Sequence, residues 1–392
     1  MATANNRTRG LPDGGNVRTP YLTGVPEPVR DGDATRATIA VISNPRSDGN
    51  KAHRGRVRQF CATRPEIVHF EIVETGDLAA ALDCIADSDF RAIAINGGDG
   101  TVQGVLTRLF GEGAPTRAVP PIAVLPSGRT NLIAKDLGAT GDPIVALERL
   151  IALTALTAQD LRGHIIKRDL IELHTGRGPS TMGMFFAAGA LADALLYCRH
   201  KLYPLKMPNW LAHLLTVIAG LVSVLTNSTS RLLPPIPREA SVMIGGRSLR
   251  GRFQVLMVST LQALVLTGRL APPRDGNLGL VAMERRRSTV FRSVFAGLLG
   301  RAGHKPIEGL HFEAGPEIRL GAELSDAIMD GESFHAAPGH GIQLRTGPSV
   351  RFIDLAPGVR SAARITDEGA FAPAAQPGLA TLSPLWNSHS RP

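Results

Sequence analysis

The stretch Ala92-Ile-Ala-Ile-Asn-Gly-Gly-Asp-Gly-Thr101 joins a short apolar run to a turn that has three glycines in four positions. Glycines permit a turn that a Cβ would block, and they let the backbone approach a ligand closely. Thr101 can cap a helix that starts there, and the free N–H groups at a helix N-terminus attract anions. The stretch therefore predicts a strand, a tight turn and a helix whose start suits a phosphate.

The residues alone allow other interpretations of this stretch. It can be a plain strand–helix turn with Asp99 or Thr101 as the N-cap, but a plain turn seldom needs three glycines. The spacing Gly98-x-Gly100-x-x-x-Gly104 differs from that of the dinucleotide-binding pattern. A carboxylate beside a pyrophosphate would also repel it unless a cation intervened. The P-loop pattern is absent from the sequence.

Two more turns rich in Gly, Asn, Ser and Thr follow β-branched runs. The turn at residues 44–49 follows the run at 38–43, and the turn at residues 126–131 follows the run at 121–125. Because the carboxyl ends of parallel strands share one edge of a sheet, we expect all three turns to converge on one crevice. Such a crevice suits phosphate, and Asp99 within it suits a metal ion or a hydroxyl group.

The first half of the chain alternates between strand and helix patterns joined by short links. This alternation predicts a three-layer α/β domain with a parallel sheet. We expect strands at residues 37–43, 66–73, 91–95 and 121–125, and helices at 51–62, 77–87, 101–110, from 131, and at 144–158.

The second half has a different period. Strand-like runs separated by Gly- and Pro-rich turns predict a mainly antiparallel β domain, interrupted by helices near 190–226 and 287–301. The expected divisions are a disordered tail at 1–35, the α/β domain at 36–163, the β-rich domain at 164–345, a return segment at 346–356 on the first domain, and a disordered tail at 357–392.

Composition limits the partners and the compartment. A net charge of +9 favours anionic partners, while 5% aromatic residues argue against a base-stacking nucleic-acid surface. Three cysteines without CxxC spacing indicate a reducing, cytoplasmic setting. The N-terminus lacks a signal-peptide pattern, and the apolar stretch at 210–225 is too short to span a bilayer. That stretch, preceded by basic residues, could lie at a membrane interface or be a core helix.

The ordered set of an NPxSG-like turn, GGDGT, a PxGxxN-like turn and a distant Asp-Gly-Glu resembles the diacylglycerol kinase catalytic family, over roughly residues 37–356. GGDGT alone is shared with NAD kinases and phosphofructokinases. The resemblance implies an ATP- and Mg²⁺-dependent lipid kinase with its active site in the interdomain cleft. By similarity, the nucleotide would be bound by Asn44, Ser47, Thr75, Gly97, Gly98, Asp99, Gly100, Thr101, Gly128, Thr130 and Asn131, with Asp99 acting through Mg²⁺.

Asp330-Gly-Glu332 matches the catalytic Asp-Gly-Glu of that family. Transfer of a phosphoryl group to an alcohol needs a group that positions the hydroxyl and takes its proton. We expect Glu332 to be this base and Asp330 to be second to it. Taken alone, the segment would also make a good type I turn between strands.

A further segment, at residues 272–278, resembles a family segment in which an Asp, here Asp275, and nearby carbonyls hold a structural Mg²⁺. A turn with Asp275-Gly276 at its corner is an equal alternative. The chain departs from the family pattern at Arg129, at Leu132, where an acidic residue is frequent, and at Asp48, which is extra. Arg129 could contact a phosphate or point outward.

We therefore expect a cytoplasmic kinase, peripheral at the inner membrane face, that phosphorylates diacylglycerol or a related lipid. The expected partners are its lipid substrate and the membrane surface, with no nucleic acid, and a homodimer stays open. Two alternatives remain. One is a soluble-substrate kinase of the NAD kinase type, which the PxGxxN-like turn and the late Asp-Gly-Glu disfavour. The other is a non-catalytic nucleotide- or lipid-binding homologue, in which Arg129 and Leu132 would mark lost activity.

Overall fold

A computed structural model describes residues 22–23, 38–52, 55–114, 118–197, 220, 222–226, 236–262, 276–298 and 306–357. One compact unit extends to Ala356 and contains every strand and helix reported below. Nearly all of the two expected tails, 1–35 and 357–392, lies outside the described residues.

The first part of the unit is a parallel sheet in the order β3-β2-β4-β5. Its strands are β2 (Ile39–Ser43), β3 (Ile67–Glu71), β4 (Ala92–Gly97) and β5 (Ile122–Pro126). Every residue of β2, β4 and β5 is buried, as expected for strands covered on both faces by helices. A short strand, β1 (Leu22–Thr23), pairs antiparallel with β3.

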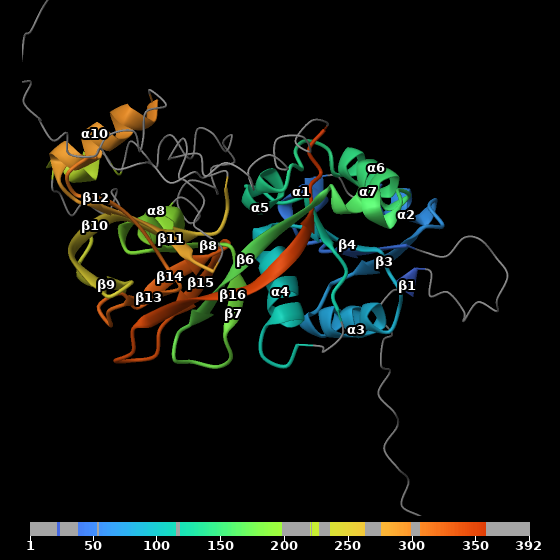
Figure 1. The fold of residues 1–392 in the computed structure, drawn as a ribbon, viewed down its shortest axis with the longest axis horizontal. Helices are drawn as coiled ribbons and strands as arrows, with labels where there is room; N and C mark the ends of the chain where they lie inside the picture. Colours follow the sequence, from blue (N-terminus) through green and yellow to red (C-terminus); the bar gives the residue numbers. More distant parts are fainter. Residues whose placement is uncertain are drawn as a thin grey trace, which may run out of the picture. The chain divides into compact units, whose positions relative to one another are not determined.

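Helices cover both faces of this sheet, with α2, α6 and α7 on one side and α3 and α4 on the other (Figure 1). Apolar side chains on one face of α4 (Val102, Val105, Leu106 and Leu109) are buried in the core. The helices are α1 (Asp48–Ala52), α2 (Arg56–Ala62), α3 (Thr75–Ala86), α4 (Asp99–Phe110), α5 (Leu132–Asp136), α6 (Pro143–Thr154) and α7 (Ala158–Arg162).

One helix expected from the sequence is divided. The apolar spacing predicts a single helix over residues 51–62, whereas the structure has α1 and α2, with Gly55 in the left-handed region at φ 76° just before α2. Residues 53–54 between them are outside the described ranges. A left-handed residue ends α-helical geometry, and glycine adopts this conformation without steric cost.

The second part is antiparallel. Its strands are β6 (Ile165–His174), β7 (Thr181–Gly183), β8 (Phe185–Ala188), β9 (Glu239–Ile244), β10 (Arg247–Ser259), β11 (Leu278–Glu284), β12 (Leu310–Gly315), β13 (Glu317–Leu320), β14 (Asp326–Met329), β15 (Glu332–His335) and β16 (Ile342–Ile353). The predicted fold class, a parallel α/β part followed by a mainly antiparallel part, is thus confirmed.

Strand β16 connects the two parts. It pairs antiparallel with β6 and β13, and near its end Phe352 pairs in parallel with Ile122 of β5. A register shift between Thr346 and Ser349 interrupts the pairing with β6, where Gly347-Pro348 stands in the sequence. Proline lacks the N–H that a ladder needs and is tolerated at such an irregularity.

In the described residues of the second part, helix comprises α8 (Ala190–Tyr197), α10 (Arg287–Leu298) and helical residues at 220 and 222–226. The helix expected over 190–226 therefore begins as predicted, but residues 198–219 and 221, including Cys198 and most of the apolar stretch from Trp210, are outside the described ranges. None of the helices in the described ranges has the length and apolar character needed to cross a bilayer.

Candidate active site

The three turns meet at the carboxyl edge of the parallel sheet. The Asn44 amide donates to the Asn96 carbonyl at 2.9 Å, and the Gly49 amide donates to the Ser127 carbonyl at 3.1 Å. The Asn44 side-chain amide also donates to Oγ1 of Thr101 at 2.9 Å. These bonds tie the turn after β2 to those after β4 and β5, as the strand order requires.

Glycine is required where these turns approach one another. A Cβ added to Gly128 would lie 2.6 Å from the Cα of Gly98, so the second and third turns touch through backbone alone. A Cβ on Gly49 would lie 2.5 Å from the Ser127 carbonyl oxygen. These separations are far below van der Waals contact, so the glycines are needed for packing between the turns as well as for any approach of a ligand.

The third turn is held by its own side chain. Asn131 has a φ of 53°, in the left-handed region, and its Oδ1 accepts the Gly128 amide at 2.6 Å. Asparagine tolerates this backbone conformation better than most residues because its short polar side chain bonds locally. Thr130, one residue earlier, is exposed.

Asp99 caps the helix that follows the third turn. Its two carboxylate oxygens accept the backbone amides of Leu132 and Ile133, at 3.3 and 3.2 Å, at the start of α5. Burial raises the pKa of Asp99 above its usual value, and the two amides and the charge of Lys135 partly oppose this rise. Leu132, where the family frequently has an acidic residue, therefore contacts Asp99 through its backbone amide rather than through its side chain.

The Asp-Gly-Glu turn lies against the start of α4. A Cβ placed on Gly100 would come within 2.5 Å of Oε1 of Glu332, and the exposed Glu332 side chain thus borders the glycine-rich turn. The buried Gln103 side chain, one turn further along α4, donates to the Met329 carbonyl at 2.9 Å. The structure brings residues 330–332 next to residues 97–101, although the two segments come from different sheets.

Asp330 and Glu332 have different surroundings. Asp330 is 4% exposed, and its carboxylate accepts the amides of Met184 and Phe185 at 2.9 Å each. Burial, with a smaller contribution from the charge of Asp99, raises the pKa of Asp330 to about 8 against the opposing effect of those amides. Asp330 therefore anchors the turn to β8, whereas the Glu332 side chain is exposed.

Two other predicted nucleotide contacts come from the helix starts. Ser47 precedes α1, its amide donates to the Asn44 carbonyl at 3.2 Å, and its buried hydroxyl has no hydrogen-bond partner among the described residues. A buried hydroxyl without a partner is a group that a ligand phosphate could satisfy. Thr75 is the first residue of α3, which follows the carboxyl end of β3.

Arg129 and Asp48, two of the departures from the family pattern, form an ion pair. Nε of Arg129 lies 3.1 Å from Oδ2 of Asp48, and the side chains are 35% and 51% exposed. The pair links the first turn to the third. A pair this exposed contributes about 0–1 kcal/mol, so an incoming phosphate can replace it at small cost.

A magnesium ion fits this site only if the nucleotide phosphates supply some of its ligands. No group of three His, Cys, Asp or Glu side chains is close enough to hold a metal anywhere in the described residues. Magnesium is commonly bound by one or two carboxylates together with substrate phosphates and water. Asp99, desolvated and at the glycine-rich turn, suits that arrangement.

Asp275 lies outside the described residues, so its structural metal stays a prediction. Its neighbour Gly276 donates its amide to Oδ2 of Asp169 at 2.9 Å, and its carbonyl accepts the Thr346 hydroxyl at 3.0 Å.

A buried ion pair near the site was not predicted from the sequence. Nε of Arg168 in β6 lies 3.1 Å from Oδ2 of Asp136, the last residue of α5, and both side chains are buried. Oδ1 of Asp136 also accepts the Gln262 amide at 2.8 Å. Buried pairs of this kind are costly to break from one side, so the pair fixes α5 relative to the antiparallel part.

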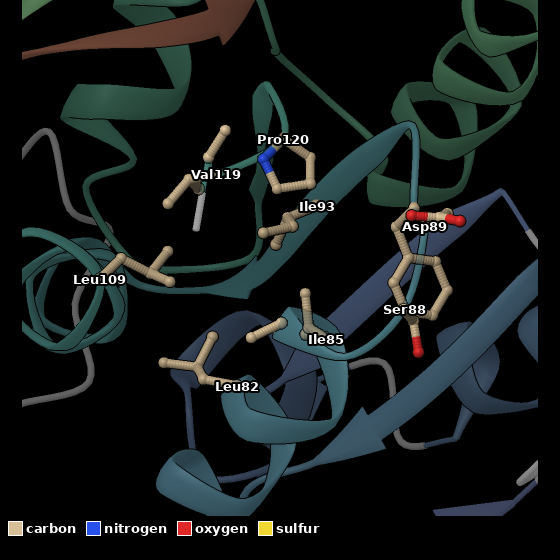
Figure 2. Close-up of a pocket in the computed structure, with 11 residues that line it drawn as sticks. Leu82, Ile85, Ser88, Asp89, Ile93, Leu109, Val119 and Pro120 are labelled. Carbon is tan, nitrogen blue, oxygen red and sulfur yellow. The ribbon is translucent and has the colours of Figure 1, made fainter. Parts of the chain in front are cut away.

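A pocket of the described residues lies away from this site (Figure 2). It is lined by α3, the end of α4 and the segment before β5, including Leu82, Ile85, Leu109 and Val119. Ile93, near the beginning of β4, also contributes to its wall. The pocket is therefore at the amino end of the strands, opposite the glycine-rich turns, and it is mainly apolar.

The glycine-rich turn of the parallel part thus faces the acidic turn of the antiparallel part. Residues 38–161 match the family model of the diacylglycerol kinase catalytic domain. The chain is also similar to the eye-specific diacylglycerol kinase of Drosophila melanogaster, at 30% identity over 128 residues, or 31% of this chain and 8% of that protein. The resemblance to the diacylglycerol kinase catalytic family seen in the sequence is thus confirmed over residues 38–161.

Solved structures extend the likeness of fold beyond this segment. A candidate diacylglycerol kinase from Bacillus anthracis str. Sterne has a TM-score of 0.55 at 16% identity. A diacylglycerol kinase from the same organism has a TM-score of 0.51, also at 16% identity. Each comparison covers 82% of this chain and 98% of the other. At this identity the likeness supports the two-part fold and carries no information on substrate.

Proposed function

We propose that the protein is an ATP-dependent lipid kinase that transfers the γ-phosphoryl group to a hydroxyl of diacylglycerol or a closely related lipid. The observation that supports this proposal is the position of Glu332 against Gly100, at the turn proposed to hold the phosphates. A carboxylate placed beside a phosphate-binding turn can serve an alcohol that attacks the terminal phosphate.

In the proposed reaction, Glu332 accepts the proton of the lipid hydroxyl as its oxygen attacks the γ-phosphorus. The bond from that phosphorus to the β–γ bridging oxygen breaks, and ADP leaves with the bond's electrons. Amides of the turn at residues 97–101 would orient the phosphates. Magnesium bound by Asp99 would supply charge neutralisation. Asp330 would keep the turn that carries Glu332 in place through its bonds to Met184 and Phe185.

Membrane contact through α10 belongs to the same proposal. Phe291 and Phe295 are 43% and 65% exposed, and their spacing of four residues puts them on one face of the helix. Arg287 and Arg292 on the same helix are exposed as well. Aromatic residues flanked by arginines on a helix favour the interface of an anionic bilayer, such as an inner membrane face.

The proposal is tested with labelled ATP and a total lipid extract, followed by identification of the labelled product. Labelling of diacylglycerol or a related lipid alcohol is the expected result. A parallel reaction with NAD in place of lipid addresses the soluble-substrate alternative. Transfer to NAD but not to lipid, or ATP binding with no transfer to any alcohol, would contradict the proposal.

A further inference from the structure

Four buried polar side chains form a continuous row beneath the three turns. They are His69 in β3, Ser43 in β2, Asn96 in β4 and Ser127 just after β5, and none is more than 4% exposed. Nε2 of His69 lies 2.7 Å from the Ser43 hydroxyl, and the Asn96 amide donates to that hydroxyl at 2.8 Å. The Ser127 hydroxyl donates to Oδ1 of Asn96. The row crosses all four parallel strands.

The hydrogen bonds of this row have one consistent direction. Ser127 donates to Asn96, and Asn96 donates to Ser43, so the Ser43 oxygen is used as an acceptor and its own proton is left to donate. The neighbouring acceptor is Nε2 of His69, provided that the ring is neutral with its proton on Nδ1. Each of the three side-chain hydrogen bonds along the row then has one donor and one acceptor, as buried polar groups require.

Asn96 connects this row to the turns above it. Its backbone carbonyl accepts the Asn44 amide at 2.9 Å and the side chain of Asn50 at 3.1 Å. The same Asn50 amide group donates to the Asn44 carbonyl at 2.8 Å. Asn96 also directly precedes the Gly97–Thr101 turn. A rotation of Asn96 would therefore move both the first turn and the second.

We propose that His69, Ser43, Asn96 and Ser127 are positioning residues that hold the three turns in the arrangement that binds ATP, and that this arrangement depends on a neutral His69. The inference rests on the proposed nucleotide-binding function. It assigns no contact between these four residues and the substrate.

The surroundings of His69 support a neutral ring. Burial lowers its pKa from the ordinary 6.5; the charge of Glu71 opposes this effect, and that of Arg58 adds to it. Arg58 and Glu71 are themselves an ion pair, from α2 and β3. The nearby Cys61 thiol is buried and has its pKa raised to about 12, so it stays uncharged. A protonated ring would have to donate to Ser43, and the Ser43 proton would lose its acceptor.

Two variants separate positioning from general stability. Ser43→Ala removes the centre of the row, and we expect the dissociation constant for ATP to rise about 5-fold or more, which corresponds to about 1 kcal/mol. Amide exchange should speed up in residues 44–50 and 96–101 in particular. Ser88→Ala is the control, because its half-buried hydroxyl bonds to the Cys84 carbonyl at 2.9 Å at the opposite end of the strands.

The pH dependence of ATP affinity in His69→Gln distinguishes a positioning role from a merely structural one. Its amide oxygen can accept the Ser43 proton and does not titrate. Because the pKa of His69 is lowered from 6.5, its ring takes up a proton only in more acid solution. ATP affinity should therefore fall between pH 8 and pH 5 by several-fold more in the wild type than in His69→Gln, while the two agree at pH 8.

Calorimetric ATP titration at both pH values measures this directly and needs no lipid turnover, so an absence of lipid phosphorylation leaves the test intact. Wild-type ATP affinity and unchanged local exchange in Ser43→Ala would overturn the proposal, as would identical pH dependence in wild type and His69→Gln.

Discussion

Glu332 and Gly100 lie in contact range although they come from different sheets and opposite ends of the folded chain. A Cβ on Gly100 would be 2.5 Å from Oε1 and 3.2 Å from Cδ of Glu332. The contact involves the far end of a flexible side chain, so a substitution at Gly100 would displace the carboxylate rather than the backbone. A substitution at Gly100 therefore tests whether the reaction depends on the position of the proposed base, Glu332.

Gly100→Ala should lower kcat by about 100-fold, because a shift of about 1 Å in a reacting group costs this much. ATP affinity should change little, since the added methyl group points at Glu332 rather than at the turns. Steady-state kinetics with lipid micelles and an independent ATP titration separate the two effects.

Gly104→Ala is the matched control for this substitution. It lies on the same helix, and its added Cβ would only reach Cδ2 of Leu78 at 4.0 Å. Alanine is favoured over glycine inside a helix by about 1 kcal/mol, so this variant should be at least as stable as the wild type with unchanged kcat. Equal kcat in both alanine variants would remove Glu332 from the proposed mechanism.

Gln103→Met tests the tether between α4 and the Asp-Gly-Glu turn. The substitution keeps the volume but leaves the Met329 carbonyl without its donor, at a cost of about 1–3 kcal/mol. We expect a lower free energy of unfolding in urea, together with a lower kcat. Thr107→Val is the comparison, because Thr107 on the same helix bonds to the backbone of Met182 in β7 rather than to the backbone of the Asp-Gly-Glu turn. Thr107→Val should lose similar stability and keep kcat, and a matching loss of kcat would contradict the tether.

Asp99→Asn should abolish turnover and leave the fold intact. The amide oxygen can still accept one of the two α5 amides, so the loss of helix capping should stay within about 2 kcal/mol. The loss of charge should reduce kcat by about 100-fold or more. Circular dichroism and thermal unfolding check the fold, and a rate close to that of the wild type would overturn the role of Asp99.

The local parts of this architecture could be predicted from the sequence. The strands before the three turns begin and end within two residues of the expected positions, because β-branched runs and glycine turns are short-range signals. The sequence predicts a β-rich domain that ends at residue 345 and a separate return segment at 346–356, yet the single strand β16 extends across this division from Ile342 to Ile353, with a register shift at Gly347-Pro348. A ladder can absorb such a break when the partner strand is long.

The contacts of the site depend on the tertiary fold and left no signal in the sequence. In the sequence, Gln103 cannot be distinguished from any other polar residue on a helix. Asp136 likewise cannot be distinguished from any polar residue at the end of a helix. Their partners, Met329 and Arg168, are brought to them only by the packing of the antiparallel part on the α/β part. The Arg129–Asp48 pair is a similar case, since each residue alone is only a departure from the family pattern.

Phe291→Ser with Phe295→Ser should weaken binding to vesicles of phosphatidylcholine and phosphatidylglycerol. The two phenyl rings would no longer enter the interface, and each contributes about 1–2 kcal/mol when buried. Sedimentation with vesicles measures the bound fraction. Val145→Ser on α6, where the side chain is 61% exposed, is the control and should bind as the wild type does. Equal binding by all three proteins would exclude α10 as the membrane contact.

Asp330→Asn should change how stability depends on pH. The pKa of Asp330 is raised from 3.8 to about 8, so the folded protein holds a proton there that the unfolded chain releases above pH 3.8. The stabilisation of the folded protein by this bound proton is complete below pH 3.8 and is lost as pH rises towards about 8.

Asparagine at position 330 does not titrate, and its NH₂ group faces one of the backbone amides of Met184 and Phe185, so that two donors meet. The Asp330→Asn variant should therefore be less stable than the wild type at pH 5. Its deficit relative to the wild type should shrink by pH 8, as measured by urea unfolding at both values. A deficit that is constant or grows with pH would show that Asp330 is ionised in the folded protein.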